Sequence, residues 1–448
     1  MKNKVLFVSL GCDKNLVDSE EMIGILRREN FEFTDFEEEA DVIIVNSCCF
    51  IGDAKEESIN TILQMAEYRK NGRCKALIVT GCLAQRYKDE IISEIEEVDA
   101  VLGTSSYDQI INAIKEAFDG NKYEKFMSLD RLIVEEKDRI LTTGGHFAYL
   151  KIAEGCNKRC TYCVIPSVRG NYRSVPMEEL VDTAKKLADK GVKELILVAQ
   201  ETTVYGMDIY GKKMLPELLD KLCEVDGIVW IRLMYCYPEE ITDELIAAIR
   251  DHDKVCNYID MPIQHCNDRL LKLMGRKTNK AQIKEIAGKL RKEIKDIAIR
   301  TTLITGFPSE TDEEHEELMD FVDEMEFERL GAFPYSKEEG TPAYSMDGQI
   351  PDEIKEKRRD AIMELQQEVA FDNGDKMIGK EILVMIEGKI VDENVYIGRT
   401  YMDAPSVDGN IFIDSYEELI TGDFVKVKVT GSKDYDLIGE CIWKEFGN

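Results

Sequence analysis

The central part of this chain is organised around the stretch GCNKRCTYC, residues 155–163, which follows an apolar run at residues 147–153. Its cysteines, Cys156, Cys160 and Cys163, have the spacing CxxxCxxC. Three thiolates from one loop can bind three irons of a 4Fe–4S cube, which normally takes four cysteines. The next cysteine in sequence is Cys223. The spacing therefore predicts a cluster in which one iron is open to a small molecule.

A zinc site or a group of buried free thiols is the alternative interpretation of this loop. Zinc loops more often use CxxC pairs and need a fourth Cys or His close by. The odd number of cysteines therefore favours the cluster over zinc.

A second set of cysteines lies in the N-terminal region, residues 1 to about 125, where strand and helix patterns alternate. Such alternation predicts a parallel sheet with helices on both faces. Cys12, Cys48 and Cys82 each follow one of the first three predicted strands. Because ligands bind outside the carboxyl ends of parallel strands, we expect these three thiols to form a second site at one sheet edge.

The alternative for each of these thiols is the role of a small buried hydrophobe, which is common for cysteine. Three cysteines at the same place in successive strand–helix units make coincidence a poor explanation. Cys49 and Cys74 break the pattern and are left out of the predicted site, because Cys49 points away from Cys48 in an extended backbone and Cys74 precedes its strand.

The rest of the chain divides into three further segments. Residues 126–143 form a charged linker with a weak strand signal at 131–134. Residues 144–375 contain six strand–helix units and predict a partial, open version of the eight-unit βα barrel, whose chemistry lies at the C-terminal strand ends. Residues 376–448 contain five short β-rich runs separated by turn signals, which predict a small antiparallel β-barrel. The expected fold class is therefore multidomain α/β.

Composition limits the cellular context. The chain has 448 residues, with 88 Asp and Glu against 58 Lys and Arg, a formal net charge of −30. This balance suits a basic partner better than general capture of nucleic acid, which needs basic patches. Thirteen cysteines in a chain of this length fit a reducing cytosol. The first apolar run is shorter than a signal-peptide core, and none approaches the length of a membrane span, so we expect a cytoplasmic protein.

The whole chain resembles the methylthiotransferases of the radical S-adenosylmethionine (SAM) superfamily. The CxxxCxxC loop with an aromatic, Tyr162, before its last cysteine is similar to the superfamily signature. The order of a three-cysteine domain, a radical SAM barrel and a small β-barrel called TRAM is typical of the family. Three stretches resemble the branch that modifies a ribosomal protein rather than tRNA: LGCDKNLVDSE at 10–20, NSCCFI at 46–51 and YIGRTYMDAP at 396–405. Asp13 and Cys49 stand where this branch usually has proline and glycine.

This resemblance implies two 4Fe–4S clusters, with SAM as both radical source and methyl donor. The cluster on the CxxxCxxC loop would cleave SAM to a 5′-deoxyadenosyl radical, and the cluster on Cys12, Cys48 and Cys82 would carry the sulfur. The implied product is a methylthio group on the β-carbon of an aspartate in the small-subunit ribosomal protein S-twelve. The implied partners are that basic protein, a flavodoxin- or ferredoxin-like electron donor and a sulfur source, with no membrane or nucleic acid. No catalytic residue is expected beyond the cluster ligands.

A few other positions resemble SAM contacts of the superfamily. Glu201 matches the acidic position that bonds the SAM amino group, although loop carboxylates are also often simply solvated. Gly306 would let the backbone approach the adenosine closely, or it only ends a strand. Tyr162 would shelter the cluster or contact adenine, or it is a core aromatic. His265 is expected to be structural, and Arg276, in a Met-Gly-Arg stretch that also resembles the family, has no assigned role.

Two rival functions have to be weighed. A tRNA adenosine methylthiotransferase has the same architecture, but an RNA-binding barrel needs a basic, aromatic-bearing face. Residues 376–448 contain 8 Lys and Arg against 14 Asp and Glu. We expect Asp403, Asp408 and Asp414 to lie on an acidic surface that receives a basic protein. The other rival, an iron–sulfur electron carrier, usually closes each cube with four cysteines and needs no barrel.

Overall fold

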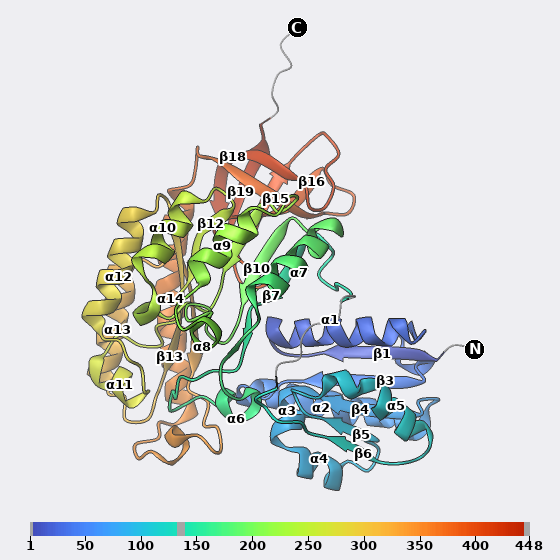
Figure 1. Ribbon diagram of the computed structural model, residues 1–448. Coiled ribbons are helices and arrows are strands. Elements are labelled where there is room, and N and C mark those ends of the chain that lie inside the picture. The colour runs from blue at the N-terminus through green and yellow to red at the C-terminus, as the bar shows by residue number, and fades with distance from the viewer. Residues whose placement is uncertain (1–2, 132–138, 443–448) are drawn as a thin grey trace.

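The computed structural model describes residues 3–131 and 139–442. It contains three bodies, each built on its own sheet (Figure 1). The predicted weak strand at 131–134 falls almost entirely outside the described residues. No helix in the described ranges is both long enough and apolar enough to cross a bilayer.

The N-terminal body is a six-stranded parallel sheet, as the strand–helix alternation predicts. Its strand order is β2-β1-β3-β4-β5-β6. The strands are β1 (Lys4–Ser9), β2 (Glu32–Phe33), β3 (Val42–Ser47), β4 (Ala76–Thr80), β5 (Ala100–Leu102) and β6 (Tyr123–Lys125). The helices are α1 (Asp13–Arg28), α2 (Gly52–Asn71), α3 (Gly81–Arg86), α4 (Lys88–Glu94) and α5 (Ile110–Phe118), with 3₁₀ turns η1 (Glu37–Glu39) and η2 (Tyr107–Gln109). Two apolar clusters cover the two faces of the sheet, so β3 and β4 are buried throughout.

The second body is an open, six-stranded parallel sheet in the order β14-β13-β12-β11-β10-β7. The strands are β7 (Phe147–Lys151), β10 (Glu194–Val198), β11 (Trp230–Leu233), β12 (Val255–Asp260), β13 (Ala298–Thr305) and β14 (Arg329–Pro334). The main helices are α7 (Met177–Asp189), α9 (Leu215–Cys223), α10 (Asp243–Asp251), α12 (Lys280–Glu293), α13 (Asp312–Met325) and α14 (Asp352–Asp375). Short elements lie in the loops: β8 (Ala153–Glu154), β9 (Arg173–Ser174), α6 (Ile165–Arg169), α8 (Met207–Tyr210), α11 (Asp268–Leu273), η3 (Pro238–Glu240) and η4 (Pro342–Ser345). This is the partial barrel that the six units predict.

The third body is a closed five-stranded barrel in the order β15-β16-β17-β19-β18. The strands are β15 (Glu381–Lys389), β16 (Val395–Thr400), β17 (Ile411–Asp414), β18 (Phe424–Lys433) and β19 (Asp436–Cys441). Four of its strand pairs are antiparallel, as expected, but β17 and β19 are parallel. The barrel is therefore not purely antiparallel, because β18 lies between these two strands in sequence and carries the chain back before β19 begins.

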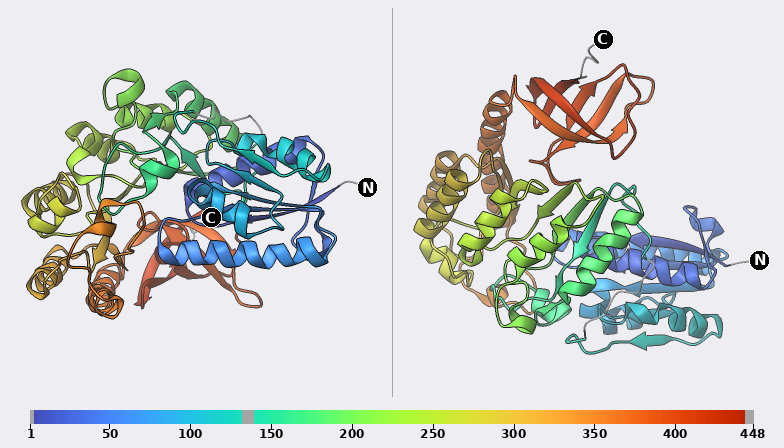
Figure 2. Two further views of the ribbon diagram at one scale, coloured as in Figure 1. Left: turned by 90° about the horizontal axis from the view of Figure 1, so that it is seen from below. Right: turned by 45° about the horizontal axis from the view of Figure 1, so that its top comes forward.

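The small barrel packs onto the end of the open sheet at which its strands begin (Figures 1 and 2). Trp230, the first residue of β11, contacts Phe424 of β18 edge-to-face, with ring centroids 4.8 Å apart. Residues of β10, β11 and β12 share one apolar cluster with the barrel core. The end at which the strands finish, where barrel chemistry lies, therefore stays clear of this contact.

Buried ion pairs join the same two bodies, and they correct one sequence-based expectation. Asp403 bonds Arg329 at the start of β14, and Asp408 bonds Arg300 (Nε to Oδ1, 3.3 Å) and the hydroxyl of Tyr258. These two carboxylates are buried, so they do not belong to an acidic surface. Of the three expected acidic residues, only Asp414 is exposed.

A second buried network crosses this contact at the other side of the sheet. Glu194, the first residue of β10, pairs with Arg232 of β11 and with Arg399 of β16. Arg399 continues to Glu387, which also bonds His146. All of these groups lie at the end of the open sheet at which its strands begin. The charges of the two bodies therefore neutralise each other inside the interface.

Candidate functional site

Three cysteines of the N-terminal body meet at the carboxyl edge of its sheet. Cys12 caps α1 after β1, Cys48 follows β3, and Cys82 lies in the first turn of α3 after β4. The three strands are adjacent in the sheet, so their ends bring the thiols together. Gly11 has a φ of +90°, and an added Cβ there would lie 2.8 Å from Sγ of Cys48. The close passage of these two loops therefore depends on a glycine.

Burial disfavours the thiolate forms of Cys48 and Cys82. Burial, followed by the neighbouring Cys82, raises the pKa of Cys48 to about 12. Burial also raises the pKa of Cys82, although Arg169 opposes this. The thiolate is the form that binds metal, so loading this site releases protons.

The two neighbouring cysteines lie elsewhere, as expected. Cys49 is fully buried in the apolar cluster beneath the sheet edge, and burial strongly raises its pKa. Cys74 precedes β4, and its thiol donates to the carbonyl of Ala76 (3.2 Å). Cys74 therefore sits at the opposite end of the strand from Cys82.

The CxxxCxxC loop runs from β8 to α6, beyond the end of β7. The amide of Cys156 donates to the carbonyl of Gly170 (3.1 Å), and that of Cys163 donates to the carbonyl of Cys160 (3.1 Å). Gly155 enters the loop with a φ of +80°, where an added Cβ would lie 2.2 Å from the carbonyl oxygen of Asn171. Burial raises the pKa of Cys156 to about 11 and that of Cys163 to about 12.

Arg169, at the end of α6, connects the two cysteine sets. Its Nε lies 3.3 Å from Sγ of Cys82, and its other nitrogens donate to Asp18 (2.6 Å) and Asn15 (2.8 Å) of α1. It also pairs with Glu154 (3.1 Å), which directly precedes the CxxxCxxC loop. Arg169 thus joins the auxiliary site, the set of Cys12, Cys48 and Cys82, to the start of the CxxxCxxC loop across the domain interface. Sequence spacing carries no signal for this residue, because its partners are far apart in the chain.

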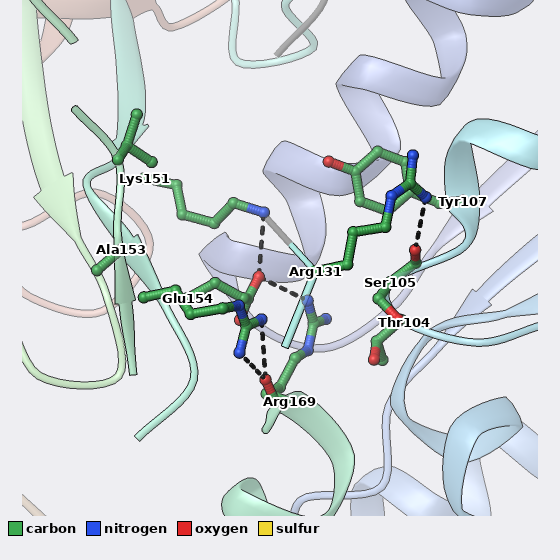
Figure 3. A pocket seen from close by; sticks show the side chains of 10 residues that line it. Thr104, Ser105, Tyr107, Arg131, Lys151, Ala153, Glu154 and Arg169 are labelled. Carbon is green, nitrogen blue, oxygen red and sulfur yellow. Dashed lines mark hydrogen bonds and ion pairs between the residues drawn. The ribbon is translucent and has the colours of Figure 1, made fainter. Parts of the chain in front are cut away.

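A small, partly open pocket lies beside this connection, lined from both bodies. Figure 3 shows Lys151 and Arg169 converging on Glu154, with Tyr107 and Ser105 on the opposite wall. Burial disfavours ionised Glu154, but the two cations outweigh it and lower its pKa to about 2. Lys151 also contacts Asp18, so charged groups of both bodies are held in one buried network.

Two further contacts fix the N-terminal body over the open sheet. The amide of Gly52 donates to the hydroxyl of Ser336 (3.0 Å) after β14. Arg86 of α3 pairs with the buried Glu338 (2.6 Å). The carboxyl edge of the first sheet is therefore held against the carboxyl end of the second.

Glu201 lies close to the CxxxCxxC loop. Its Oε1 lies 3.6 Å from Nζ of Lys158, a loop residue, and accepts a hydrogen bond from Thr203 (3.2 Å). Burial raises its pKa to about 7, although Lys158 opposes this shift. A buried carboxylate beside the loop is suited to an ammonium ligand, and it is not the solvated loop residue that was the alternative.

The other two predicted SAM contacts, Tyr162 and Gly306, also pack against protein groups. Tyr162 packs against an apolar cluster that contains Leu270, Met274 and Phe307. Gly306 has a φ of +70°, and an added Cβ would lie 2.2 Å from Cγ of Lys355. The need for glycine at this turn therefore comes from Lys355 and the backbone conformation, and adenosine contact by its backbone stays a prediction.

His265 has the features of a structural residue. It is fully buried, and its Nδ1 accepts a hydrogen bond from the amide of Asn267 (2.9 Å). Burial lowers its pKa to about 3, so the imidazole is neutral. It carries no charge for acid–base chemistry near neutral pH.

The donor chemistry of both cysteine sets suits iron–sulfur cubes. No group of three His, Cys, Asp or Glu side chains in the described ranges is placed to hold one ion. In a cube each cysteine binds a different iron, so the thiols stand further apart than the ligands of a single ion do. Each set consists of thiols alone, the ligand type of such clusters.

Comparisons with known proteins match this architecture in the same order. The N-terminal body matches the uncharacterized protein family UPF0004 over residues 4–103, the open sheet matches the radical SAM superfamily over 150–322, and the small barrel matches the TRAM domain over 378–442. Among solved structures, the radical SAM methyltransferase TsrM from Kitasatospora setae, with cobalamin and a [4Fe-4S] cluster bound, has a TM-score of 0.56 at 14% identity. Each chain covers 77% of the other, which shows a shared fold.

Three relatives that are similar along nearly the whole chain share the name ribosomal protein uS12 methylthiotransferase RimO. The relative from Lachnoclostridium phytofermentans is 60% identical over 97% of this chain and 99% of its own length. Those from Acetivibrio thermocellus and Clostridioides difficile are 53% and 48% identical, over 99% and 98% of this chain and 99% of each relative. The predicted resemblance is thereby confirmed, and the chain belongs to the RimO family of radical SAM enzymes.

Proposed function

We propose that this chain transfers a methylthio group to the β-carbon of an aspartate in ribosomal protein uS12. The names of its relatives support this substrate. The structural observation that carries the proposal is the position of Arg169, which contacts Cys82 of the N-terminal set and Glu154 directly before the CxxxCxxC loop. A β C–H bond is not acidic, so its functionalisation needs radical chemistry together with a separate source of sulfur.

The proposed cofactors are two 4Fe–4S clusters and SAM. Cys156, Cys160 and Cys163 would hold one cluster, and Cys12, Cys48 and Cys82 would hold the auxiliary cluster. When bound, these groups supply a carbon radical for hydrogen abstraction, the sulfur atom and the methyl group. Three ligands for each cluster leave one iron free for a small molecule.

The chain's own residues would bind and orient these groups. Ionised Glu201 would accept a hydrogen bond from the SAM amino group, and the nearby Lys158 would favour this ionised form. Tyr162 would shelter the cluster from one side, and the backbone at Gly306 would approach the adenosine. Arg169 would hold the auxiliary loop against the CxxxCxxC loop and keep Cys82 in an electropositive environment.

The proposed partners are uS12 as basic substrate, a flavodoxin- or ferredoxin-like electron donor and a sulfur source. Because the substrate is ribosomal, we place the reaction in the cytoplasm. We also propose domain limits at 1–125, 144–375 and 376–448, with 126–143 as the linker. The last strand of the first sheet ends at Lys125 and the barrel strands begin at Glu381, which supports these limits.

The decisive experiment measures product mass. Anaerobically reconstituted protein is incubated with SAM, reductant and sulfide, and with either uS12 or tRNA, and both substrates are then examined by mass spectrometry. We expect a methylthio mass gain on uS12 alone, located on one aspartate. A gain on tRNA would instead assign the tRNA-modifying function, and failure to bind SAM would indicate an electron carrier.

A further inference from the structure

Arg276 is a buried cation that forms no ion pair with any carboxylate among the described residues. Its side chain is 6% exposed, and one nitrogen, Nη2, donates to the carbonyl of Pro262 (2.8 Å). Nε and Nη1 are buried and make no hydrogen bond. A buried polar group without a partner is rare in folded proteins and calls for an explanation.

The other buried arginines differ from Arg276 in this respect. Each of them pairs with at least one carboxylate: Arg139 with Glu20, Arg169 with Asp18, Arg232 with Glu194, Arg358 with Glu310 and Arg399 with Glu194. Burying an unpaired charge is costly because the charge loses its water. Five of the buried arginines thus have a carboxylate that compensates for the lost water, and Arg276 does not.

The position of Arg276 is directly behind the CxxxCxxC loop. It follows α11, whose last turn receives the loop: Thr161 donates from its amide to Met274 (2.9 Å) and from its hydroxyl to Leu273 (2.8 Å). The adjacent Gly275 has a φ of +74°, and an added Cβ there would lie 2.9 Å from the carbonyl oxygen of Arg159. The residues directly before Arg276 are therefore packed against the loop that carries the cysteines.

The guanidinium itself is held in place beside this loop. It lies over the ring of Tyr237, 4.2 Å from the ring centroid. Burial lowers the pKa of Arg276, but the neighbouring Tyr162, Tyr237, Cys160 and Glu239 raise it by more. Of these neighbours Glu239 is a carboxylate, and it forms its ion pair with Lys158 (3.3 Å) instead of with Arg276.

A loaded cysteine loop supplies a further negative charge close to Arg276. Cysteines that bind iron are thiolates, and a cube held by three thiolates is a net anion that gains one more negative charge on reduction. Cluster potentials depend on net charge and on hydrogen bonds to the sulfurs. In a buried site of low dielectric, a fixed cation has a large effect on such a charge.

We propose that Arg276 is the counter-ion of the cluster on the CxxxCxxC loop and raises its reduction potential. The electron comes from the external donor, and the added negative charge on the cluster is stabilised by the guanidinium. Arg276 is thus a positioning and tuning residue that acts through the cluster. This inference rests on the proposed function, because it requires a cluster on this loop.

The test is a potentiometric titration of the loop cluster, followed by electron paramagnetic resonance. The protein used is the full chain in which Cys12, Cys48 and Cys82 are replaced by alanine, so that the signal comes from the loop cluster alone. We expect Arg276→Gln to shift the midpoint potential to a more negative value and Arg276→Lys to restore most of the shift. Arg159→Gln is the matched control, because it removes an equal charge from a loop position that is more open to solvent and should shift the potential much less.

Two outcomes would overturn the inference. The first is an unchanged midpoint in Arg276→Gln at wild-type iron content. The second is an unchanged midpoint with weakened SAM binding, which would assign the guanidinium to the ligand carboxylate instead. Failure of the unsubstituted loop to load any cluster would count against the proposed function rather than against the role of Arg276.

Thermal unfolding of the cluster-free full chain provides a second readout. A purely structural Arg276 would make Arg276→Met destabilising. An uncompensated charge predicts that this variant keeps or raises the melting temperature, because an apolar side chain of similar length removes the cost of the buried cation. A clear fall in the melting temperature of Arg276→Met would contradict the inference.

Discussion

Nε of Arg169 lies 3.3 Å from Sγ of Cys82, so a cation from the radical SAM body touches a thiol of the N-terminal body. The contact joins two sites that are far apart in sequence. It places an electropositive group at the auxiliary site, which favours the thiolate form that binds metal. The two bodies therefore meet at the predicted second cysteine site.

The first prediction concerns iron content. Two cubes imply about eight irons in each fully reconstituted chain. Replacing Cys156, Cys160 and Cys163 by alanine should halve the iron and abolish SAM cleavage. Replacing Cys12, Cys48 and Cys82 should also halve the iron but spare some SAM cleavage, because the radical-generating site remains. Iron analysis and release of 5′-deoxyadenosine are the measurements.

Cys49 provides the control for this experiment. It adjoins Cys48, but its side chain lies in the apolar cluster. Cys49→Ala should therefore keep near-normal iron. Loss of half the iron in this variant would show that the auxiliary ligand is Cys49 and not Cys48.

The second prediction concerns Arg169. Arg169→Gln removes one cationic partner from the buried Asp18 and one from Glu154. Removing one partner of a buried ion pair is expected to cost about 3 kcal/mol in free energy of unfolding. Chemical denaturation of the cluster-free chain measures this loss.

Arg173 is the matched control for Arg169. It lines the same pocket, but it donates hydrogen bonds to the backbone carbonyls of Arg169 and Asn171. Arg173→Gln should therefore cost clearly less than Arg169→Gln, which breaks bonds to carboxylates. Equal losses in the two variants would mean that the Arg169 network contributes nothing beyond packing.

The third prediction concerns the small barrel. Ending the chain at residue 375 would expose the apolar ends of β10, β11 and β12 and leave Arg232, Arg300 and Arg329 without their partners in the barrel. We therefore expect the truncated chain to aggregate, which light scattering and circular dichroism would detect. A soluble, cooperatively folded product of this truncation would contradict the structural role of the interface.

The fourth prediction concerns pH. Burial raises the pKa of Glu201 to about 7, so its carboxyl group is protonated in part of the chains at neutral pH. Only the ionised form can pair with the SAM ammonium group. The affinity of cluster-loaded protein for SAM should therefore rise between about pH 6 and pH 8. Isothermal titration calorimetry across this range measures it.

Glu201→Gln tests whether this carboxyl group causes the pH dependence. The amide cannot ionise, so the variant should bind SAM more weakly and lose most of the rise. The same raised pKa makes folding stability change with pH in the opposite direction to SAM affinity. The folded chain holds the proton more tightly than the unfolded chain does, so the contribution of Glu201 to stability falls as the pH rises from about 4.5 toward 7. A rise in affinity that persists in Glu201→Gln would have to come from another group.

The meeting of the auxiliary cysteines was predictable because their strands are strongly apolar. β3 and β4 are continuous buried runs, and the carboxyl ends of parallel strands meet at one edge. The edge strands β2 and β6 were missed because they are short and contain charged residues, so they form no apolar run. The ligand assignment of these cysteines remains a prediction.

The interface of the small barrel was not predictable from the sequence. Asp403, Asp408 and Arg399 look like surface charges when they are read alone, and their partners lie far away along the chain. Only the folded arrangement brings opposite charges together at the strand starts. The same holds for Arg169, whose partners come from α1 and β8.

The last prediction concerns capture of the substrate protein. Exposed acidic residues gather at the end of β17 and in the loop that follows it: Asp414, Glu417 and Glu418, beside the 96% exposed Tyr416. Ribosomal proteins are basic because they bind RNA, so opposite charges should speed encounter with this loop. The small barrel packs at the strand starts, away from the cysteine loops, so its charges should affect binding of uS12 and not the chemical step. Reversing the three acidic residues to lysine should raise the KM for uS12 several-fold and leave kcat unchanged.

The salt dependence of the KM distinguishes this electrostatic effect from a structural change in the loop. Screening shortens the reach of charges to roughly 8 Å at physiological ionic strength, so the wild-type KM should rise with salt. The charge-reversed variant should respond weakly or in the opposite direction, because its loop no longer attracts a basic protein. The melting temperature should not change, since these residues are exposed, whereas Asp403→Lys should lower it by breaking the buried pair with Arg329. Equal salt dependence in the wild type and in the reversed variant would remove this loop from substrate capture.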